Sequence, residues 1–108
     1  MTTRDVLVVT TTHDAQEKAR ALAELVVRER LAACAQVYPI GSVYRWEGEV
    51  RSAEEWRIDF KTTAGVVDRL GAFLREHHGY ETPEVVAVPV VASSEAYLAW
   101  VAAETAGP

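Results

Sequence analysis

The chain has 108 residues, of which 49% are apolar, so one globular domain over residues 1–108 is expected and a disordered chain is excluded. Eleven basic and sixteen acidic residues give a formal net charge of -5, which excludes the basic face that general nucleic-acid binding requires. The single cysteine, Cys34, excludes an internal disulfide, and the apolar run at residues 6–9 is too short to cross a membrane. The expected location is therefore the cytoplasm.

The beginning of the chain predicts a strand followed by a helix. Residues 6–9 form an apolar run rich in β-branched side chains, which is typical of a strand buried on both faces. Asp14 and Glu17 have the spacing of a capping box, and apolar residues then recur at helical spacing. A helix is therefore expected over residues 14–30.

The middle of the chain predicts two strands and a hairpin. A strand is expected over residues 31–38, and a second extended segment over residues 42–46 after a break at Pro39 and Gly41. The following Glu47-Gly48 pair lies between two strand-like runs, where a glycine can adopt a positive φ, so it predicts a hairpin turn.

The strand that returns from this hairpin has a clear alternation of side chains. Apolar and charged residues occupy successive positions, which places them on opposite faces of a sheet. The apolar set is Trp56, Ile58 and Phe60, and the charged set is Arg57, Asp59 and Lys61.

The last third of the chain predicts a helix, a strand and another helix. The second helix is expected over residues 64–77. A β-branched run predicts a strand over residues 85–91, in which Pro89 removes one ladder donor and indicates an edge position or a bulge. Ser93 or Ser94 is expected to cap the final helix.

The resulting order is βαββαβ with an extra C-terminal helix, which predicts an α+β, ferredoxin-like antiparallel sheet. In this arrangement both crossover helices lie on one face of the sheet, and the other face needs cover. A chain this short can hardly supply that cover, so association of several copies through the second face is expected.

Five short segments, spread over nearly the whole chain, carry a family resemblance. They are LAACA at residues 31–35, SVYRWEGE at residues 42–49, KTT at residues 61–63, HGYETPE at residues 78–84 and YLAW at residues 97–100. In this order they resemble the CutA family of divalent-cation tolerance proteins. The resemblance implies a ferredoxin-like fold, a homotrimer and a role in tolerance of copper and other divalent cations.

A metal site is the first functional hypothesis. Imidazole and carboxylate groups suit copper(II), zinc or nickel, and His77, His78 and Glu81 offer them close together in the sequence. Adjacent histidines point in different directions, however, and His77 also falls on the apolar face of the predicted helix, where it could be a core residue. A site shared between subunits stays open. Some family members carry a cysteine in the region of residues 10–12, which here are all threonines.

A cleft between subunits is the second hypothesis. Aromatic and charged side chains crowd the predicted hairpin, and they suit a subunit interface or a ligand cleft. Cys34, flanked by alanines, is interpreted as a small buried residue instead of a reactive thiol. The residues predicted to converge at such a cleft are Cys34, Tyr44, Trp46, Lys61, Tyr80, Glu81 and Glu84.

These features leave three function classes to compare. The first is a trimer that binds or responds to divalent cations such as copper(II). The second is a signalling or scaffold trimer, similar in plan to the PII nitrogen regulators, that binds a small molecule or a partner protein at its clefts. The third is an enzyme, for which no catalytic residue is assigned because no serine has a motif that places a base beside it and no phosphate-binding glycine pattern is present. Nucleic acid and membrane are not expected partners.

Overall fold

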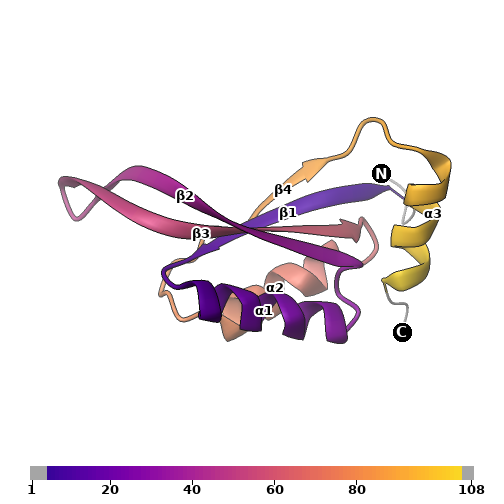
Figure 1. The fold of residues 1–108 in the computed structure, drawn as a ribbon, viewed down its shortest axis with the longest axis horizontal. Helices are drawn as coiled ribbons and strands as arrows, with labels where there is room; N and C mark the ends of the chain where they lie inside the picture. The colour runs from indigo at the N-terminus through magenta and orange to yellow at the C-terminus, as the bar shows by residue number, and fades with distance from the viewer. Residues whose placement is uncertain (1–4, 106–108) are drawn as a thin grey trace.

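The computed structural model describes residues 5–105, which form one four-stranded antiparallel sheet and three helices (Figure 1). The strand order is β2-β3-β1-β4, so the predicted α+β, ferredoxin-like arrangement is confirmed. The elements are β1 (Val6–His13), α1 (Gln16–Arg28), β2 (Cys34–Trp46), β3 (Glu49–Thr63), α2 (Val67–His77), β4 (Val86–Pro89) and α3 (Glu95–Glu104).

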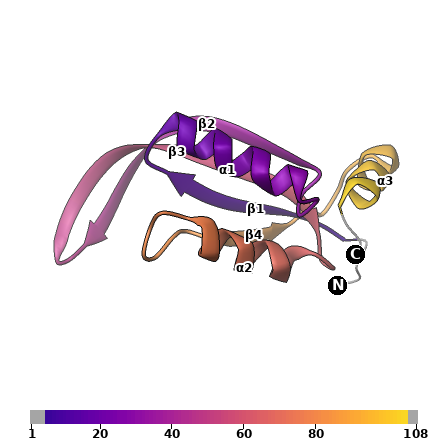
Figure 2. The same ribbon diagram turned by 90° about the horizontal axis from the view of Figure 1, so that it is seen from below.

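The hydrophobic core lies between the sheet and the two crossover helices. Both α1 and α2 lie on the same side of the sheet in Figure 1, and Figure 2 looks onto these helices from below. We call this side the covered face. Val9 pairs with Phe60 across the β1–β3 ladder, and each is at most 1% exposed. The other fully buried core side chains are Ala19, Val26, Ala32, Ile58, Leu70 and Leu74.

The opposite side, which we call the open face, carries a polar network. The Asp59 carboxylate accepts hydrogen bonds from Tyr38 Oη at 2.6 Å, Thr10 Oγ1 at 2.8 Å and Arg57 Nε at 3.1 Å. Burial alone would raise the pKa of Asp59, but these three hydrogen bonds outweigh it and hold the pKa below its usual value. The network therefore keeps a charged carboxylate on the sheet surface opposite to the one that α1 and α2 cover.

The start of α1 differs from the prediction. The helix begins at Gln16 with Ala15 as its N-cap, and no side chain caps it. The Asp14 carboxylate instead lies 3.1 Å from His13 Nδ1 and 3.5 Å from Lys18 Nζ. The predicted capping box is therefore wrong, because neighbouring cationic and imidazole groups hold the side chain that would have capped the helix.

The second strand also differs from the prediction. It runs without a break over Cys34–Trp46, across Pro39 and Gly41. Because β2 is an edge strand, it has one row of unpaired backbone groups and tolerates a proline. Glu47 and Gly48 have φ angles of 50° and 78°, as a type I′ turn requires, so the predicted hairpin is confirmed. The hairpin reaches well beyond the two crossover helices (Figure 1).

The C-terminal elements are the short strand β4 and the helix α3. Strand β4 is confined to Val86–Pro89 and forms the other edge of the sheet, in agreement with the edge position inferred from Pro89. Helix α3 lies beyond the end of the sheet that is remote from the hairpin (Figure 1). Ser94 caps it by accepting a hydrogen bond from Tyr97 N–H at 3.2 Å, and Val101 anchors it as a fully buried residue. Within residues 5–105, no helix combines the length and apolar character needed to span a membrane.

Candidate functional site

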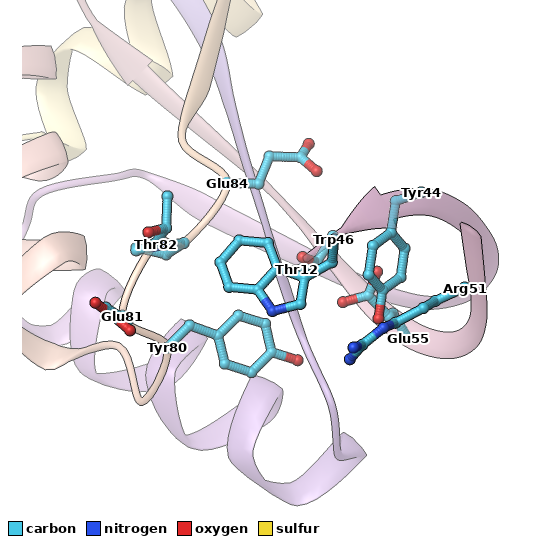
Figure 3. Close-up of a pocket in the computed structure, with 10 residues that line it drawn as sticks. Thr12, Tyr44, Trp46, Arg51, Glu55, Tyr80, Glu81, Thr82 and Glu84 are labelled. Atoms are coloured by element: carbon cyan, nitrogen blue, oxygen red, sulfur yellow. The ribbon is translucent and has the colours of Figure 1, made fainter. Parts of the chain in front are cut away.

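A pocket of about 590 Å³ lies between the β2–β3 hairpin and the loop that follows α2 (Figure 3). Pockets of this size accommodate small organic ligands. Strands β1, β2 and β3 supply one part of its wall and the loop supplies the rest. The lining residues are Thr12, Tyr44, Trp46, Arg51, Glu55, Tyr80, Glu81, Thr82, Pro83 and Glu84.

The hairpin positions the aromatic part of this wall. Tyr44 and Trp46 are two residues apart in β2, so their side chains point to the same side of the strand. Arg51 lies directly opposite Tyr44 in the β2–β3 ladder, and Figure 3 shows the two side chains next to each other. In the same view the Trp46 indole lies between Tyr80 and Glu84, so it reaches from the hairpin to the loop.

The loop is held in place by His78. Its Nε2 lies 2.6 Å from the Thr12 carbonyl oxygen, and its Nδ1 accepts a hydrogen bond from Tyr80 N–H at 3.1 Å. A carbonyl only accepts, so the proton lies on Nε2 and the imidazole is neutral. Burial lowers the pKa of His78, and its ring stacks on His13 with centroids 4.4 Å apart. These contacts fix the backbone that places Tyr80 at the pocket wall.

The Tyr80 phenol has a shifted pKa at this wall. Its pKa is raised to about 12, first by burial and then by the nearby carboxylates of Asp14 and Glu55. The phenol therefore stays protonated and neutral at physiological pH. Burial is the larger cause of this shift, and the two carboxylates add to it.

The charged lining residues give the pocket an excess of negative charge. Among residues 5–105, the one basic residue in the lining is Arg51, which lies 3.3 Å from a Glu47 carboxylate oxygen and 3.6 Å from one of Glu49, both outside the lining set. The guanidinium charge is thus offset by the hairpin itself. The acidic lining residues are Glu55, Glu81 and Glu84.

Five of the seven residues predicted to form a cleft line this pocket within one subunit. The remaining two, Cys34 and Lys61, pair with each other at the opposite end of the β2–β3 ladder. Cys34 is half-buried instead of fully buried, and its Sγ lies 3.6 Å from Tyr97 Oη. The five that line the pocket are Tyr44, Trp46, Tyr80, Glu81 and Glu84.

Four of the polar pocket residues, Thr12, Arg51, Glu55 and Thr82, were not predicted from the sequence. Arg51 could have been found, because a two-residue turn at positions 47–48 places it opposite Tyr44. No pattern in the sequence indicated that Thr12 and Glu55 would line the pocket. Thr12 reaches the pocket because β1 pairs with β3, which is a contact between distant parts of the chain, and Glu55 lies on β3 opposite Ile40 of β2.

The residues predicted to bind a metal are separated in the structure. Both ring nitrogens of His78 are occupied by backbone groups, so this side chain has no free lone pair for a metal. His77 is exposed instead of being a core residue, and its Nδ1 donates to the Phe73 carbonyl at 3.0 Å. Residues 5–105 contain no group of three or more His, Cys, Asp or Glu side chains arranged to hold a metal ion. His77, His78 and Glu81 therefore do not chelate one ion within a subunit.

Comparison with known proteins gives one consistent family. The model for the CutA1 divalent ion tolerance protein family matches residues 7–104. The chain is 38% identical over 99 residues to the divalent-cation tolerance protein CutA of Thermus thermophilus, covering 91% of this chain and 96% of that protein. It is 39% identical over 95 residues to the chloroplastic CutA of Arabidopsis thaliana, covering 87% of this chain and 52% of that protein, so it spans about half the length of this relative.

The solved structures agree with the sequence comparison. The structure of CutA from Synechococcus elongatus aligns with a TM-score of 0.91 at 35% identity, covering 98% of this chain and 95% of that chain. The divalent cation tolerance protein from Thermus thermophilus aligns with a TM-score of 0.89 at 37% identity, covering 94% of this chain and 99% of that chain.

Proposed function

The chain belongs to the CutA1 divalent ion tolerance protein family, and from this premise we propose that it acts as a homotrimer in tolerance of copper(II) and other divalent cations. The observation that carries the proposal is the family match over residues 7–104. The names of the relatives describe tolerance proteins and no enzyme, which supports a role other than catalysis. The proposed location is the cytoplasm, while relatives named chloroplastic and periplasmic show that the family is not confined to one compartment.

The surface of the subunit supports association of copies. Both β2 and β4 are sheet edges with unpaired backbone groups, which other strands readily join. Val86 and Val88 on β4 are 48% and 53% exposed, and on α3 Tyr97 and Trp100 are 38% and 43% exposed. An assembly that buries these apolar side chains would remove apolar area from water.

The trimer is tested by sedimentation equilibrium of the untagged protein at micromolar concentration. The expected result is a single species with three times the chain mass. A monomer or dimer mass at this concentration would remove the assembly from the proposal.

His77 is the side chain best prepared to bind a cation. Metal-binding histidines commonly donate one ring N–H to a carbonyl and use the other nitrogen as the ligand. The contact from His77 Nδ1 to the Phe73 carbonyl leaves Nε2 free in this way, and the ring also stacks on Phe73. One ligand holds an ion only weakly, so we propose that further ligands come from another subunit.

Titration calorimetry with copper(II), zinc and nickel tests this metal site. Saturable heat is expected for the natural protein, and His77→Ala is expected to abolish it. Arg75→Ala, at an exposed position of the same helix, serves as the control and should bind as the natural protein does. No saturable heat for the natural protein would eliminate direct cation binding, and unchanged binding by His77→Ala would eliminate His77 as the ligand.

A second candidate function is a trimer that binds a small organic molecule, and the pocket near Trp46 favours it. Its size and its oriented aromatic side chains are typical of ligand sites. A thermal-shift screen of metabolites tests this function, because a ligand that binds the folded state raises the unfolding temperature. Stabilisation by metals alone, with none by any organic ligand, would reject it.

A further inference from the structure

We propose that the pocket between the β2–β3 hairpin and the loop after α2 binds a small organic ammonium cation, with its alkyl groups against the aromatic rings and its charge facing the carboxylates. The inference rests on the second candidate function, a pocket for an organic ligand, and adds the chemical class of that ligand.

The aromatic wall is the first argument for this ligand class. Tyr44, Trp46 and Tyr80 contribute three rings from two separate segments of the chain, and all three line the same cavity (Figure 3). The face of an aromatic ring carries negative potential and attracts a cation, most strongly for tryptophan. Surrounding a substituted ammonium group with such rings combines this attraction with burial of its alkyl groups.

The charge of the lining is the second argument, and it opposes an anion. Three carboxylates line the pocket, and the single guanidinium, that of Arg51, already lies beside Glu47 and Glu49. A phosphate or carboxylate ligand would need a cation for its charge, and Arg51, which could supply one, is shared with two carboxylates of the hairpin. A positive ligand would instead be attracted by the negative charge that the three lining glutamates give this region.

The ligating atoms are the third argument, and they oppose a bare divalent ion. Aromatic rings have no lone pair to donate, whereas copper(II) and zinc require several nitrogen, oxygen or sulfur ligands. The acidic lining residues do not form a group of three placed to hold a metal. An organic cation needs no such coordination, because burial of its alkyl groups and electrostatic attraction to rings and carboxylates hold it.

The test is a titration of the full chain with tetramethylammonium, followed by the indole N–H signals in nuclear magnetic resonance. The chain has three tryptophans, and the signal of Trp46 is expected to shift saturably at millimolar ligand. Tert-butanol, a neutral molecule of similar size and shape, should shift it much less. Equal shifts with the two compounds would overturn the proposal, because the site would then respond to apolar groups without regard to charge.

Variants separate the aromatic contribution from packing. Trp46→Leu keeps an apolar side chain without a π face and is expected to weaken tetramethylammonium binding about 10-fold. Trp46→Phe should restore part of the affinity. Trp100→Leu is the matched control, since Trp100 is 43% exposed against 45% for Trp46 but lies in α3, away from the pocket, and it should not change binding. Equal binding by Trp46→Leu and Trp46→Phe would overturn the proposal.

The acidic side is tested by Glu84→Gln, which keeps the shape of the side chain and removes its charge. Binding of tetramethylammonium is expected to weaken several-fold, and this loss should shrink as salt screens the charge. If the triple variant Glu84→Gln, Glu81→Gln, Glu55→Gln binds tetramethylammonium with unchanged affinity, the proposed role of the carboxylates is overturned.

Failure of this inference differs from failure of the second candidate function. If tetramethylammonium leaves the Trp46 signal unmoved while an anionic or neutral metabolite raises the unfolding temperature, the organic-ligand function stands and the cation proposal is overturned. If no organic compound of any charge binds, both are overturned.

Discussion

The two faces of the sheet differ, although the same strands build both. In β3, Ile58 and Phe60 point to the covered face and are fully buried, whereas Arg57 and Asp59 point to the open face and join a polar network. On the covered face, stability comes from apolar area removed from water within one subunit. On the open face, the charged network is held together by hydrogen bonds. One alternating strand thus contributes both to the hydrophobic core and to the polar network on the opposite face.

The largest expected effect is on the covered face. Phe60→Ala removes a fully buried ring from the core between the sheet and the two crossover helices and leaves a cavity, so the free energy of unfolding should fall by about 3–5 kcal/mol. Denaturant unfolding measures this loss. Val43→Ala in the hairpin, where Val43 is 74% exposed, is the control and should change it by less than about 0.5 kcal/mol. Similar losses in both variants would contradict the assignment of the core.

A smaller effect is expected on the open face. Asp59→Asn removes the charge that three donors share, and a hydrogen bond to a charged group contributes about 1.5–3 kcal/mol. If copies of the chain cover this face, the variant should dissociate at higher protein concentration than the natural protein. Sedimentation across a concentration series measures that shift. Unchanged association together with reduced subunit stability would show that the network serves only the subunit.

The smallest expected effect is that of pH, which distinguishes the two faces. His78 anchors the loop after α2 and faces His13, Asp14 and Glu55, and its pKa is lowered. As the pH drops below about 6.5, the unfolded chain takes up a proton at this residue before the folded chain does. The free energy of unfolding therefore decreases as the pH decreases, by at most about 1.4 kcal/mol per pH unit. The pKa of Asp59 is also lowered, so its contribution is present above about pH 3.9 and is lost only under stronger acid.

Unfolding measured from about pH 7.5 to about pH 3 should therefore show two steps. His78→Gln should remove the step near neutral pH and leave the acid one. Asp59→Asn should leave the step near neutral pH and reduce the acid one, to which Asp14, whose pKa is also lowered, still contributes. A single step that both variants leave in place would contradict the two pKa directions.

Local patterns in the sequence were sufficient for the elements and their order. Alternation in β3, the glycine after Glu47 and the serine before α3 each act over a few residues, and the structure agrees with all three. Two local rules failed where a distant or neighbouring group intervened. Asp14 is held by His13 and Lys18 instead of capping α1, and Pro39 is tolerated because β2 lies at the edge of the sheet.

The sequence by itself thus determined the fold class and the family, because periodicity, turn residues and extended motifs are properties of neighbours along the chain. It also pointed to five residues of the pocket, since they lie in two short segments rich in aromatic and acidic residues, 44–46 and 80–84. Only the tertiary structure decided that these segments meet, and that backbone groups occupy both nitrogens of His78. The physical reason is that hydrogen bonding and charge at a site depend on pairing between strands and loops far apart in the chain.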